Sequence, residues 1–523
     1  MFARNLTVQT TTTTTQLKQN LFLLGRLLRT QSTVAANYDK ALDYEAIPRP
    51  STLSYLRDFM PGGQFQDVSF FDYAVEMRKR YGDIFVLPGL FGKPDMVMVF
   101  NTKDIESVYR NEGQWPQRQG FESVKHFREN IKGDFFKQTI GLPVAQGEQW
   151  GKMRSAINPV LMKPQNLTMY LKPLQEINDE FIARIKEIRD PKTQEVPDNF
   201  DNELNRLAFE SISLVALNRR LGLISRARNN PEAELLIKST RLNFDYTYKL
   251  DIQPSMWKII RTPTYYKNMK VQEDLFRITL NYINETLKDI EEKQKKGNNN
   301  EEIYSVLEKL LVIDKKLAVV TAIDMLIAGV DTTSVTLMAI LLCLSKNPEK
   351  QLKLREEIFK VMPTKDTVLN ESNTKHLPYL RAVIKETLRY YPNGTGSFRN
   401  PVQDVILSGY KIPKGSNVIM NFNTLLKDDA FFPQADKFLP ERWLRDANNK
   451  KDKVDPFSYL PFGVGPRICV GKRLAELEME VVIMKLLRNF EVEFHYDASK
   501  PFKANFVNMP GIPMRFTFKD IDH

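Results

Sequence analysis

The chain has 523 residues, 42% of them hydrophobic, so it can bury a large core in one or two domains. Its 75 basic and 64 acidic residues give a net charge of +11. Cys343 and Cys469 lie far apart in unlike surroundings, and the four histidines have no metal-ligand spacing, which argues against a disulfide framework and a histidine metal site. Basic and aromatic residues do not alternate as in nucleic-acid modules, so the charge favours an acidic protein partner or a membrane surface and no nucleic acid.

Residues 1–37 contain four basic residues, no acidic residue, and leucines at helical spacing from Leu17 to Leu28. This amphipathic basic composition is typical of a mitochondrial transit peptide. Arg26 and Arg29 interrupt the apolar stretch that a secretory signal or a membrane anchor needs. We therefore predict a transit peptide over 1–37 and a single domain over 38–523, with a disordered basic tail as the alternative for the leader.

Short strand-like runs occur in a chain that otherwise has helical periodicity. The runs Ile84–Leu87 and Met96–Phe100 flank a Gly-Lys-Pro-Asp turn and predict a β-hairpin. Further strand-like runs are Val405–Leu407, Val418–Met420 and Met514–Phe518. The expected fold class is mainly α with small β-sheets (α+β).

Trp150 and Arg154 are separated by one helical turn, so both can donate hydrogen bonds to one carboxylate. The alternative is a packed indole beside a surface charge. Further on, an aromatic segment from Phe244 to Trp257 predicts core packing, with a channel roof that touches a membrane as the other reading.

Lys316–Leu344 is the longest periodic segment and predicts a long central helix. Asp324 and Asp331 argue against a membrane span, because a carboxylate at the bilayer centre costs about 2.5–3.5 kcal/mol. The segment Ala328–Thr333 has poor helix propensity, which favours a functional role over a regular helix. A threonine hydroxyl beside a carboxylate can relay protons, so Asp331 and Thr332 are candidate catalytic residues, whereas a kinked core helix is the structural alternative.

Charged residues recur at helical spacing on the helix that follows. Glu386 and Arg389 form a pair three residues apart, which is worth only about 0.3–0.5 kcal/mol when exposed. Arg381 and Lys385 precede them on the same helix.

The segment Pro461–Gly471 places Cys469 at the start of a predicted helix. Free N–H groups and the helix dipole favour negative charge there, and Arg467 stands two residues away, so a thiolate is easier to form than in water. Gly463, Gly465 and Gly471 suit a tight loop with positive φ or close backbone approach. A small buried cysteine is the plain alternative.

The run Phe-Gly-Val-Gly-Pro-Arg-Ile-Cys-Val-Gly over 462–471 closely resembles the haem-ligand signature Phe-x-x-Gly-x-Arg-x-Cys-x-Gly of the cytochrome P-450 family. Four earlier segments resemble other family motifs in the same order: Trp150 with Arg154, Ala328–Thr333, Glu386 with Arg389, and Pro440–Trp443. The resemblance covers nearly the whole chain after the leader. It is strongest to the mitochondrial branch, and most of all to its insect members.

This resemblance implies the cytochrome P-450 fold, with a long central helix over haem b (iron protoporphyrin IX) and a loop that carries Cys469 as the thiolate ligand of the iron. It implies that Thr332 acts at the oxygen site and that Asp331 feeds protons towards it. It also implies a haem-binding set and a buried ion triad with a structural role. The haem-binding residues are Trp150, Arg154, Arg399, Phe462, Arg467 and Cys469, and the triad is Glu386, Arg389 and Arg442.

No flavin or nicotinamide module is recognisable, so the resemblance implies that electrons come from another protein. In the mitochondrial branch this is an adrenodoxin-like [2Fe-2S] ferredoxin, reduced by an NADPH-dependent flavoprotein. The candidate docking residues are Arg381, Lys385, Lys472 and Arg473, and ordinary solvated charge is the alternative.

The implied reaction inserts one atom of O2 into a lipophilic substrate, xenobiotic or steroid-like, on the matrix side of the inner mitochondrial membrane with peripheral membrane contact. The loops 393–398 and 505–509 are expected to face the substrate. Two alternatives remain open: a haem-thiolate isomerase or dehydratase that needs no external electrons, and a non-enzymatic haem sensor or carrier.

Overall fold

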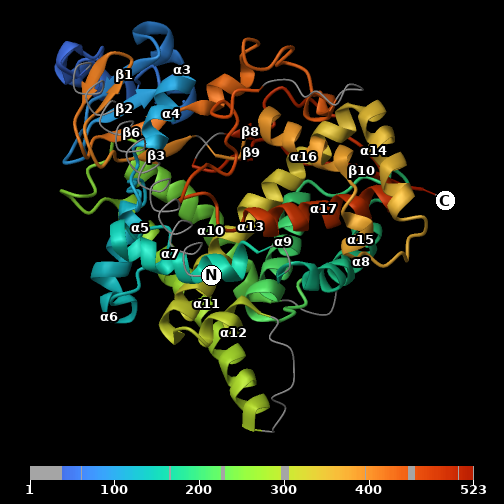
Figure 1. Cartoon of the computed structure of the whole chain (residues 1–523). Helices are drawn as coiled ribbons and strands as arrows, with labels where there is room; N and C mark the ends of the chain where they lie inside the picture. Colours follow the sequence, from blue (N-terminus) through green and yellow to red (C-terminus); the bar gives the residue numbers. More distant parts are fainter. Residues whose placement is uncertain are drawn as a thin grey trace, which may run out of the picture.

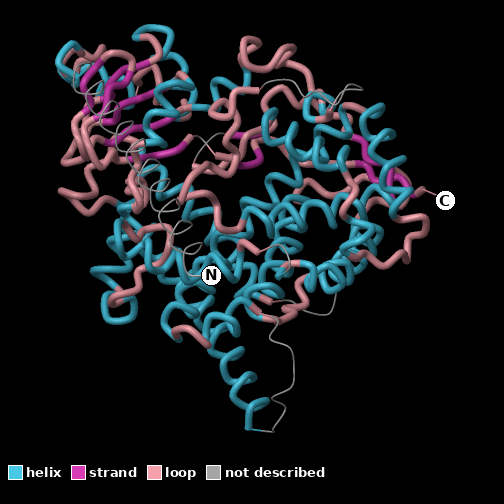
Figure 2. The backbone as a smooth tube through the Cα atoms, in the orientation of Figure 1, coloured by secondary structure: helices cyan, strands magenta, loops and turns pink. Residues whose placement is uncertain are grey.

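The structure is a computed structural model that describes residues 38–521 except 61, 67, 164–165, 225–229, 296–304, 395, 446–453 and 504–505. The predicted transit peptide, residues 1–37, lies outside this described part. A large helical body fills most of the molecule, and a small β-sheet lies at one corner of it (Figures 1 and 2). The expected combination of many helices with small sheets is confirmed.

The α-helices are α2 (Thr52–Phe59), α3 (Phe70–Tyr81), α4 (Thr102–Arg110), α5 (Glu122–His126), α6 (Gly133–Phe136), α7 (Gly147–Leu161), α8 (Leu171–Ile188), α9 (Phe200–Leu217), α10 (Pro231–Thr247), α11 (Pro263–Lys295), α12 (Val306–Leu311), α13 (Lys315–Lys346), α14 (Pro348–Val361), α15 (Glu371–Thr374), α16 (Pro378–Tyr390) and α17 (Lys472–Asn489). Two short π-helices, η2 (Phe127–Ile131) and η5 (Tyr248–Ile252), follow α5 and α10. The 3-10 turns are η1 (Tyr44–Ala46), η4 (Thr168–Tyr170), η6 (Phe422–Lys427) and η7 (Pro440–Trp443).

Helix α13 forms the centre of the main core. It begins after Asp314, whose carboxylate accepts the N–H of Leu317 at 2.5 Å, and it packs most extensively against α9. Its bounds confirm the predicted central helix to within two residues at either end. Among the described residues it is the one helix long and apolar enough to cross a membrane, but 78% of its most apolar window is buried by other parts of the protein. It is therefore a core helix, as expected.

The corner sheet has four strands in the order β1 (Ile84–Leu87), β2 (Met96–Val99), β6 (Asn417–Met420) and β3 (Ser397–Arg399). β1 and β2 pair antiparallel with Ile84 opposite Val99, so the predicted hairpin is confirmed. β2 pairs parallel with β6, and β6 pairs antiparallel with β3. Side chains alternate between two separate hydrophobic clusters, one on each face, and both faces of the sheet are therefore covered.

Three two-stranded sheets complete the fold: β4 (Val405–Leu407) with β5 (Tyr410–Ile412), β7 (Phe490–Glu493) with β10 (Thr517–Asp520), and β8 (Phe502–Lys503) with β9 (Met509–Pro510). The predicted strand Met514–Phe518 was placed too early. Its partner β7 has four residues and pairs only with Thr517–Asp520, whereas the carbonyl of Phe516 accepts the N–H of Val196 at 2.9 Å.

Candidate active site

The loop before α17 folds back on itself so that Cys469 stands at the helix N-terminus. The N–H of Cys469 donates to the carbonyl of the half-buried Phe462 at 2.9 Å. Gly463 and Gly465 have φ of 71° and 76°, as the expectation of positive φ required. Gly471 differs, because it is the N-cap of α17 with φ of −84°; a Cβ built on it would lie 3.9 Å from Sγ of Cys469.

The side chain of Cys469 is exposed although protein atoms surround it, so it faces an open space within the fold. Burial raises the pKa of its thiol, and four nearby groups oppose this: the N–H groups of Gly471 and Lys472 and the charges of Arg154 and Arg118. The positive charge that stabilises a thiolate was expected from Arg467, but it comes from Arg154 and Arg118, which are distant from Cys469 in sequence. A cation on the open side would complete the stabilisation of a thiolate.

Four arginines gather near this cysteine, and Glu112 is the carboxylate among them. The pKa of Arg118 is lowered to about 10 by burial and by the charges of Arg399 and Arg154. The pKa of Arg467 is lowered to about 8 by burial and by Arg118 and Arg399. Nε of Arg118, Nε of Arg154 and Nη1 of Arg467 are buried without a hydrogen-bond partner. The cluster has four guanidinium groups and one carboxylate, so it is short of negative charge. Two further carboxylates, such as the haem propionates, fit it.

The position of Arg467 is fixed by backbone carbonyls. Its Nε donates to the carbonyl of Pro116 and its Nη2 to that of Ala145, both at 2.8 Å. Nη2 also donates to Oε1 of Gln146 at 3.0 Å, and the guanidinium lies 4.3 Å from the ring centre of Trp150. Trp150 and Arg467, predicted separately as haem-binding residues, are therefore in contact.

Arg399 differs from the other three arginines because it already has a carboxylate partner. Its Nε donates to Glu112, and its Nη1 donates to Ser397 at 3.0 Å and to the carbonyl of Phe398 at 2.8 Å. Arg118, Glu112 and Gln146 were not singled out in the sequence. They lie outside the five motifs quoted above, and the one available signal was Arg118 itself, which has no acidic neighbour within Gln117–Gly120.

Helix α13 borders an open space at its middle. Ala328 is exposed and Thr332 is half-buried, although most residues of this helix are buried. The hydroxyl of Thr332 donates to the carbonyl of Ala328 at 2.8 Å, and the carbonyl of Thr332 accepts Nδ2 of Asn393 at 2.7 Å. Gly329 serves helix packing instead, because a Cβ there would lie 2.8 Å from the side chain of Ile212 on α9.

Asp331 points to another side of α13 and is fully buried. Neither of its carboxylate oxygens accepts a hydrogen bond from the described part of the protein. The nearby Thr240 hydroxyl donates to the carbonyl of Ile237 instead. Burial raises the pKa of Asp331 to about 6, although Thr240 and Arg241 partly oppose the rise. Asp331 and Thr332 are therefore adjacent in sequence but separated by the helix surface.

Glu386, Arg389 and Arg442 meet in one buried network. Glu386 binds Nη2 of Arg389 at 2.8 Å and Nε of Arg442 at 3.2 Å, and it accepts Nε1 of Trp443 at 2.8 Å. Arg389 also donates to the carbonyls of Leu426, Ala435 and Lys437, each at 2.8 Å. This network ties α16 to η7 and to the segment before it.

The four basic residues considered for docking also lie together. Lys472, Arg473, Lys385 and Arg381 all act electrostatically on Glu476 of α17, each lowering a pKa that burial raises. Arg473 is exposed, and Arg381 is partly exposed while it pairs with Glu480 at 2.9 Å. Helices α16 and α17 thus present one basic patch, defined as these four residues.

Aromatic rings line the region between the sheet and α10. Phe506 contacts Phe121 at 4.7 Å, and Phe244 and Phe398 at 6.4 Å each, between ring centres. Phe398 and Phe506 belong to the two loops expected to face the substrate, and the N–H of Asn508 donates to the carbonyl of Asn393 at 2.9 Å. The structure therefore brings the described parts of these loops together.

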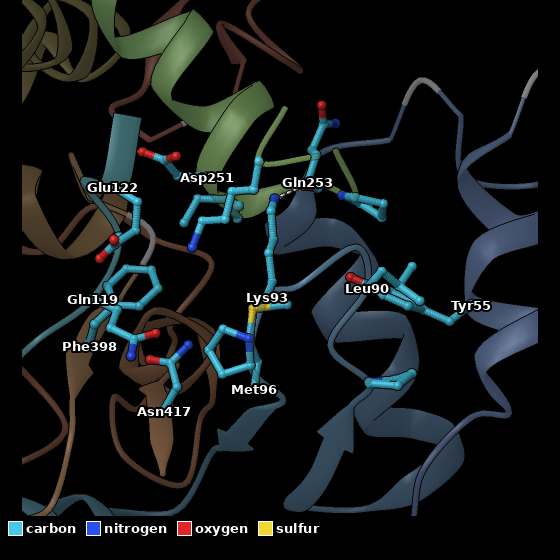
Figure 3. A pocket seen from close by; sticks show the side chains of 16 residues that line it. Tyr55, Leu90, Lys93, Met96, Gln119, Glu122, Asp251, Gln253, Phe398 and Asn417 are labelled. Atoms are coloured by element: carbon cyan, nitrogen blue, oxygen red, sulfur yellow. Dashed lines mark hydrogen bonds between the residues drawn. The ribbon is translucent and has the colours of Figure 1, made fainter. Parts of the chain in front are cut away.

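A pocket that is partly open to solvent lies beside Phe398 (Figure 3). It lies between the β1–β2 hairpin and the segment after α10, where Nζ of Lys93 donates to the carbonyl of Gln253 at 2.5 Å. Asp251 accepts the N–H of Ser123 at 3.0 Å and its hydroxyl at 2.8 Å. Phe398 lines this pocket and also contacts Phe506 in the group of aromatic rings described above. The pocket is therefore a candidate entrance to the space that these rings border.

Comparisons with known proteins agree with this geometry. The family model of cytochrome P-450 matches residues 50–517. "Probable cytochrome P-450 12d1 proximal, mitochondrial" of Drosophila melanogaster is 54% identical and covers 92% of both chains. "Cytochrome P-450 CYP12A2" of Musca domestica is 45% identical over 96% of both chains, and "Probable cytochrome P-450 12c1, mitochondrial" of Drosophila melanogaster is 44% identical over 97% of this chain and 99% of its own. The chain belongs to the cytochrome P-450 family of haem b-dependent monooxygenases.

Proposed function

We propose that this cytochrome P-450 oxidises a lipophilic substrate, xenobiotic or steroid-like, in the mitochondrial matrix with electrons from a [2Fe-2S] ferredoxin. The observation that supports the site assignment is Cys469, which stands at the N-terminus of α17 and faces open space beside arginines that lack negative partners. The names of two of the relatives above place those relatives in mitochondria. The composition of residues 1–37 supports the same location for this chain.

When bound, haem b activates O2 at an iron whose thiolate ligand favours O–O cleavage. Cys469 is the proposed ligand, and the N–H groups of Gly471 and Lys472 hold negative charge on its sulfur. Arg118, Arg154 and Arg467 are the proposed propionate ligands because their unpartnered N–H groups need acceptors. Phe462 fixes the loop through its carbonyl.

Proton delivery is proposed to use Thr332 and Asp331. The Thr332 hydroxyl borders the open space and can donate outward once it leaves the carbonyl of Ala328. Asp331, whose pKa is raised to about 6, can hold and release a proton near neutral pH. Since the two side chains lie on different sides of α13, Asp331 must rotate or act through water.

The pH dependence of stability tests the burial of Asp331. A carboxyl whose pKa rises from 3.8 to about 6 on folding opposes folding once it ionises, by about 3 kcal/mol above pH 6. Asp331→Asn should therefore be more stable than wild type at about pH 8, with a smaller gain at about pH 5, as measured by urea unfolding. Asp324→Asn is the comparison: burial also raises the pKa of Asp324, but its carboxylate pairs with Arg128 at 2.7 Å, so the substitution leaves a buried guanidinium without its partner and should destabilise. A gain at Asp331 that does not change with pH would contradict the assignment.

The basic patch is the proposed ferredoxin-docking surface. Its cations gather on two adjacent helices, and the thiolate loop leads directly into α17. Arg381→Glu with Lys385→Glu should raise the KM for ferredoxin several-fold and weaken its salt dependence, through lost steering. Arg473→Glu is a further variant on an exposed residue.

The control for this prediction is Lys79→Glu with Lys270→Glu. These lysines are exposed on α3 and α11, and both helices are labelled away from α16 and α17 in Figure 1. The carbon monoxide spectrum of every variant should remain that of wild type. Equal KM values for the patch variant and the control would rule out docking at the patch.

Peripheral membrane contact is proposed for the connection between α10 and α11. Phe244, Tyr248 and Trp257 are buried, which favours the packing reading of the aromatic segment. Ile259 and Ile260, however, are 65% and 57% exposed between the basic residues 258 and 261. Ile259→Glu with Ile260→Glu should reduce flotation with anionic lipid vesicles, and unchanged flotation would exclude this contact.

The reaction itself is tested with holoenzyme, ferredoxin, its reductase and NADPH, against steroid and insecticide panels. Oxygenated product together with NADPH consumption is expected. Turnover without ferredoxin would favour an isomerase or dehydratase, and absence of NADPH consumption with every substrate would favour a haem sensor or carrier.

A further inference from the structure

Glu112 is a buried carboxylate to which neither the motifs nor the proposed chemistry assign a role. It follows α4 and is 3% exposed. The next residue, Gly113, has φ of 74°, and a Cβ there would lie 2.9 Å from Val402. The chain therefore turns sharply after α4, and this turn keeps Glu112 in the interior.

The two oxygens of Glu112 face different parts of the site. Oε2 accepts Nε of Arg399 on β3. Oε1 lies against Gly465, where an added Cβ would be only 2.3 Å away. Gly465 is four residues before Cys469 in the loop that carries the sulfur. One carboxylate thus connects the sheet to the cysteine loop.

Glu112 also determines the charge of the arginine cluster. Arg399 and Arg467 both act on its carboxyl electrostatically, although burial is the larger influence and raises its pKa. Four guanidinium groups and one carboxylate leave three positive charges, and a thiolate at Cys469 would reduce these to two. Two propionates would balance that remainder, so the charges around the ferric porphyrin core, which itself carries +1, would sum to zero. Removal of the carboxylate would add one uncompensated positive charge beside the haem.

We propose that Glu112 is a positioning residue that holds the cysteine loop through Gly465 and keeps the reduction potential of the haem low by neutralising Arg399. Uncompensated positive charge in a low-dielectric site favours the reduced, more negative state of a nearby redox centre. The proposal rests on Cys469 as the haem ligand and not on the identity of the substrate.

The test is the haem midpoint potential of purified Glu112→Gln holoenzyme, measured by spectroelectrochemistry. We expect the ratio of reduced to oxidised haem at a fixed electrode potential to rise about tenfold, equivalent to ~59 mV for one electron. The carbon monoxide band of thiolate ligation should persist, which separates failure of this proposal from failure of the site assignment. Glu203→Gln is the matched control, because Glu203 is also buried and paired with arginine, at 3.1 Å from Arg184, but lies on α9 outside the cluster.

Two further variants separate charge from structure. Glu112→Asp keeps the charge and should leave the potential near that of wild type, even if Glu112→Gln yields too little folded protein. Gly465→Ala should lower the haem content per protein, because an added Cβ meets both the positive φ of 76° and Oε1 of Glu112. A potential unchanged in Glu112→Gln, a shift of equal size in Glu203→Gln or Glu112→Asp, or a wild-type haem content in Gly465→Ala would each overturn the proposal.

Discussion

Cys469→Ser is expected to remove the red-shifted carbon monoxide band of the reduced protein and to lower substrate oxygenation on the order of 10³-fold or more, which is about 4 kcal/mol of activation free energy. Serine has nearly the same size, but its hydroxyl does not ionise at neutral pH and cannot supply the electron donation of a thiolate. The measurements are the difference spectrum of the reduced protein with carbon monoxide and the rate of product formation.

Cys343→Ala is the matched control. Cys343 is buried in α13, and burial raises the pKa of its thiol, so it has the properties of an inert core residue. This variant should keep the band and most of the activity. Oxygenation retained in Cys469→Ser would invalidate the assignment of the whole site.

The second large effect concerns stability. Glu386→Ala should lower the free energy of unfolding by about 3–5 kcal/mol, because it leaves the fully buried Arg389 and the nearly buried Arg442 without their shared carboxylate. The expected result is loss of soluble holoprotein or a strongly lowered midpoint in urea.

Glu356→Ala is the control for this loss. Glu356 is an exposed glutamate on the neighbouring helix α14, and its replacement should change stability by no more than about 0.5 kcal/mol. If Glu386→Ala unfolds at the same urea concentration as Glu356→Ala, the triad does not stabilise the fold.

The local sequence pattern was sufficient to predict the central helix α13 and the β1–β2 hairpin. The apolar run of α13 predicted its length, and alternating strands around a glycine turn predicted the β1–β2 hairpin. The helical period placed Glu386 near Arg389, but spacing alone predicted an exposed pair that contributes little to stability. The family resemblance implied that the pair is buried, but only packing could reveal that Trp443 and three carbonyls from later in the chain complete its hydrogen bonds.

Sequence adjacency was misleading where side chains diverge around a helix. Asp331 and Thr332 are neighbours, but successive residues of an α-helix point about 100° apart, so one is buried against α10 and the other borders the open space. Gly329 belongs to the segment Ala328–Thr333 that was expected to have a functional role, yet its missing side chain makes room for Ile212. Both outcomes depend on which helices pack against α13.

The sequence by itself determined the family, the cysteine proposed to ligate the haem, and the long central helix, because these depend on patterns within short segments. Only the tertiary structure decided that Arg118 lies beside Arg154, Arg399 and Cys469 and that Glu112 contacts both Arg399 and the cysteine loop. These residues come from segments more than 250 positions apart, and their interaction arises from burial and mutual charge, which have no periodic signal in the chain.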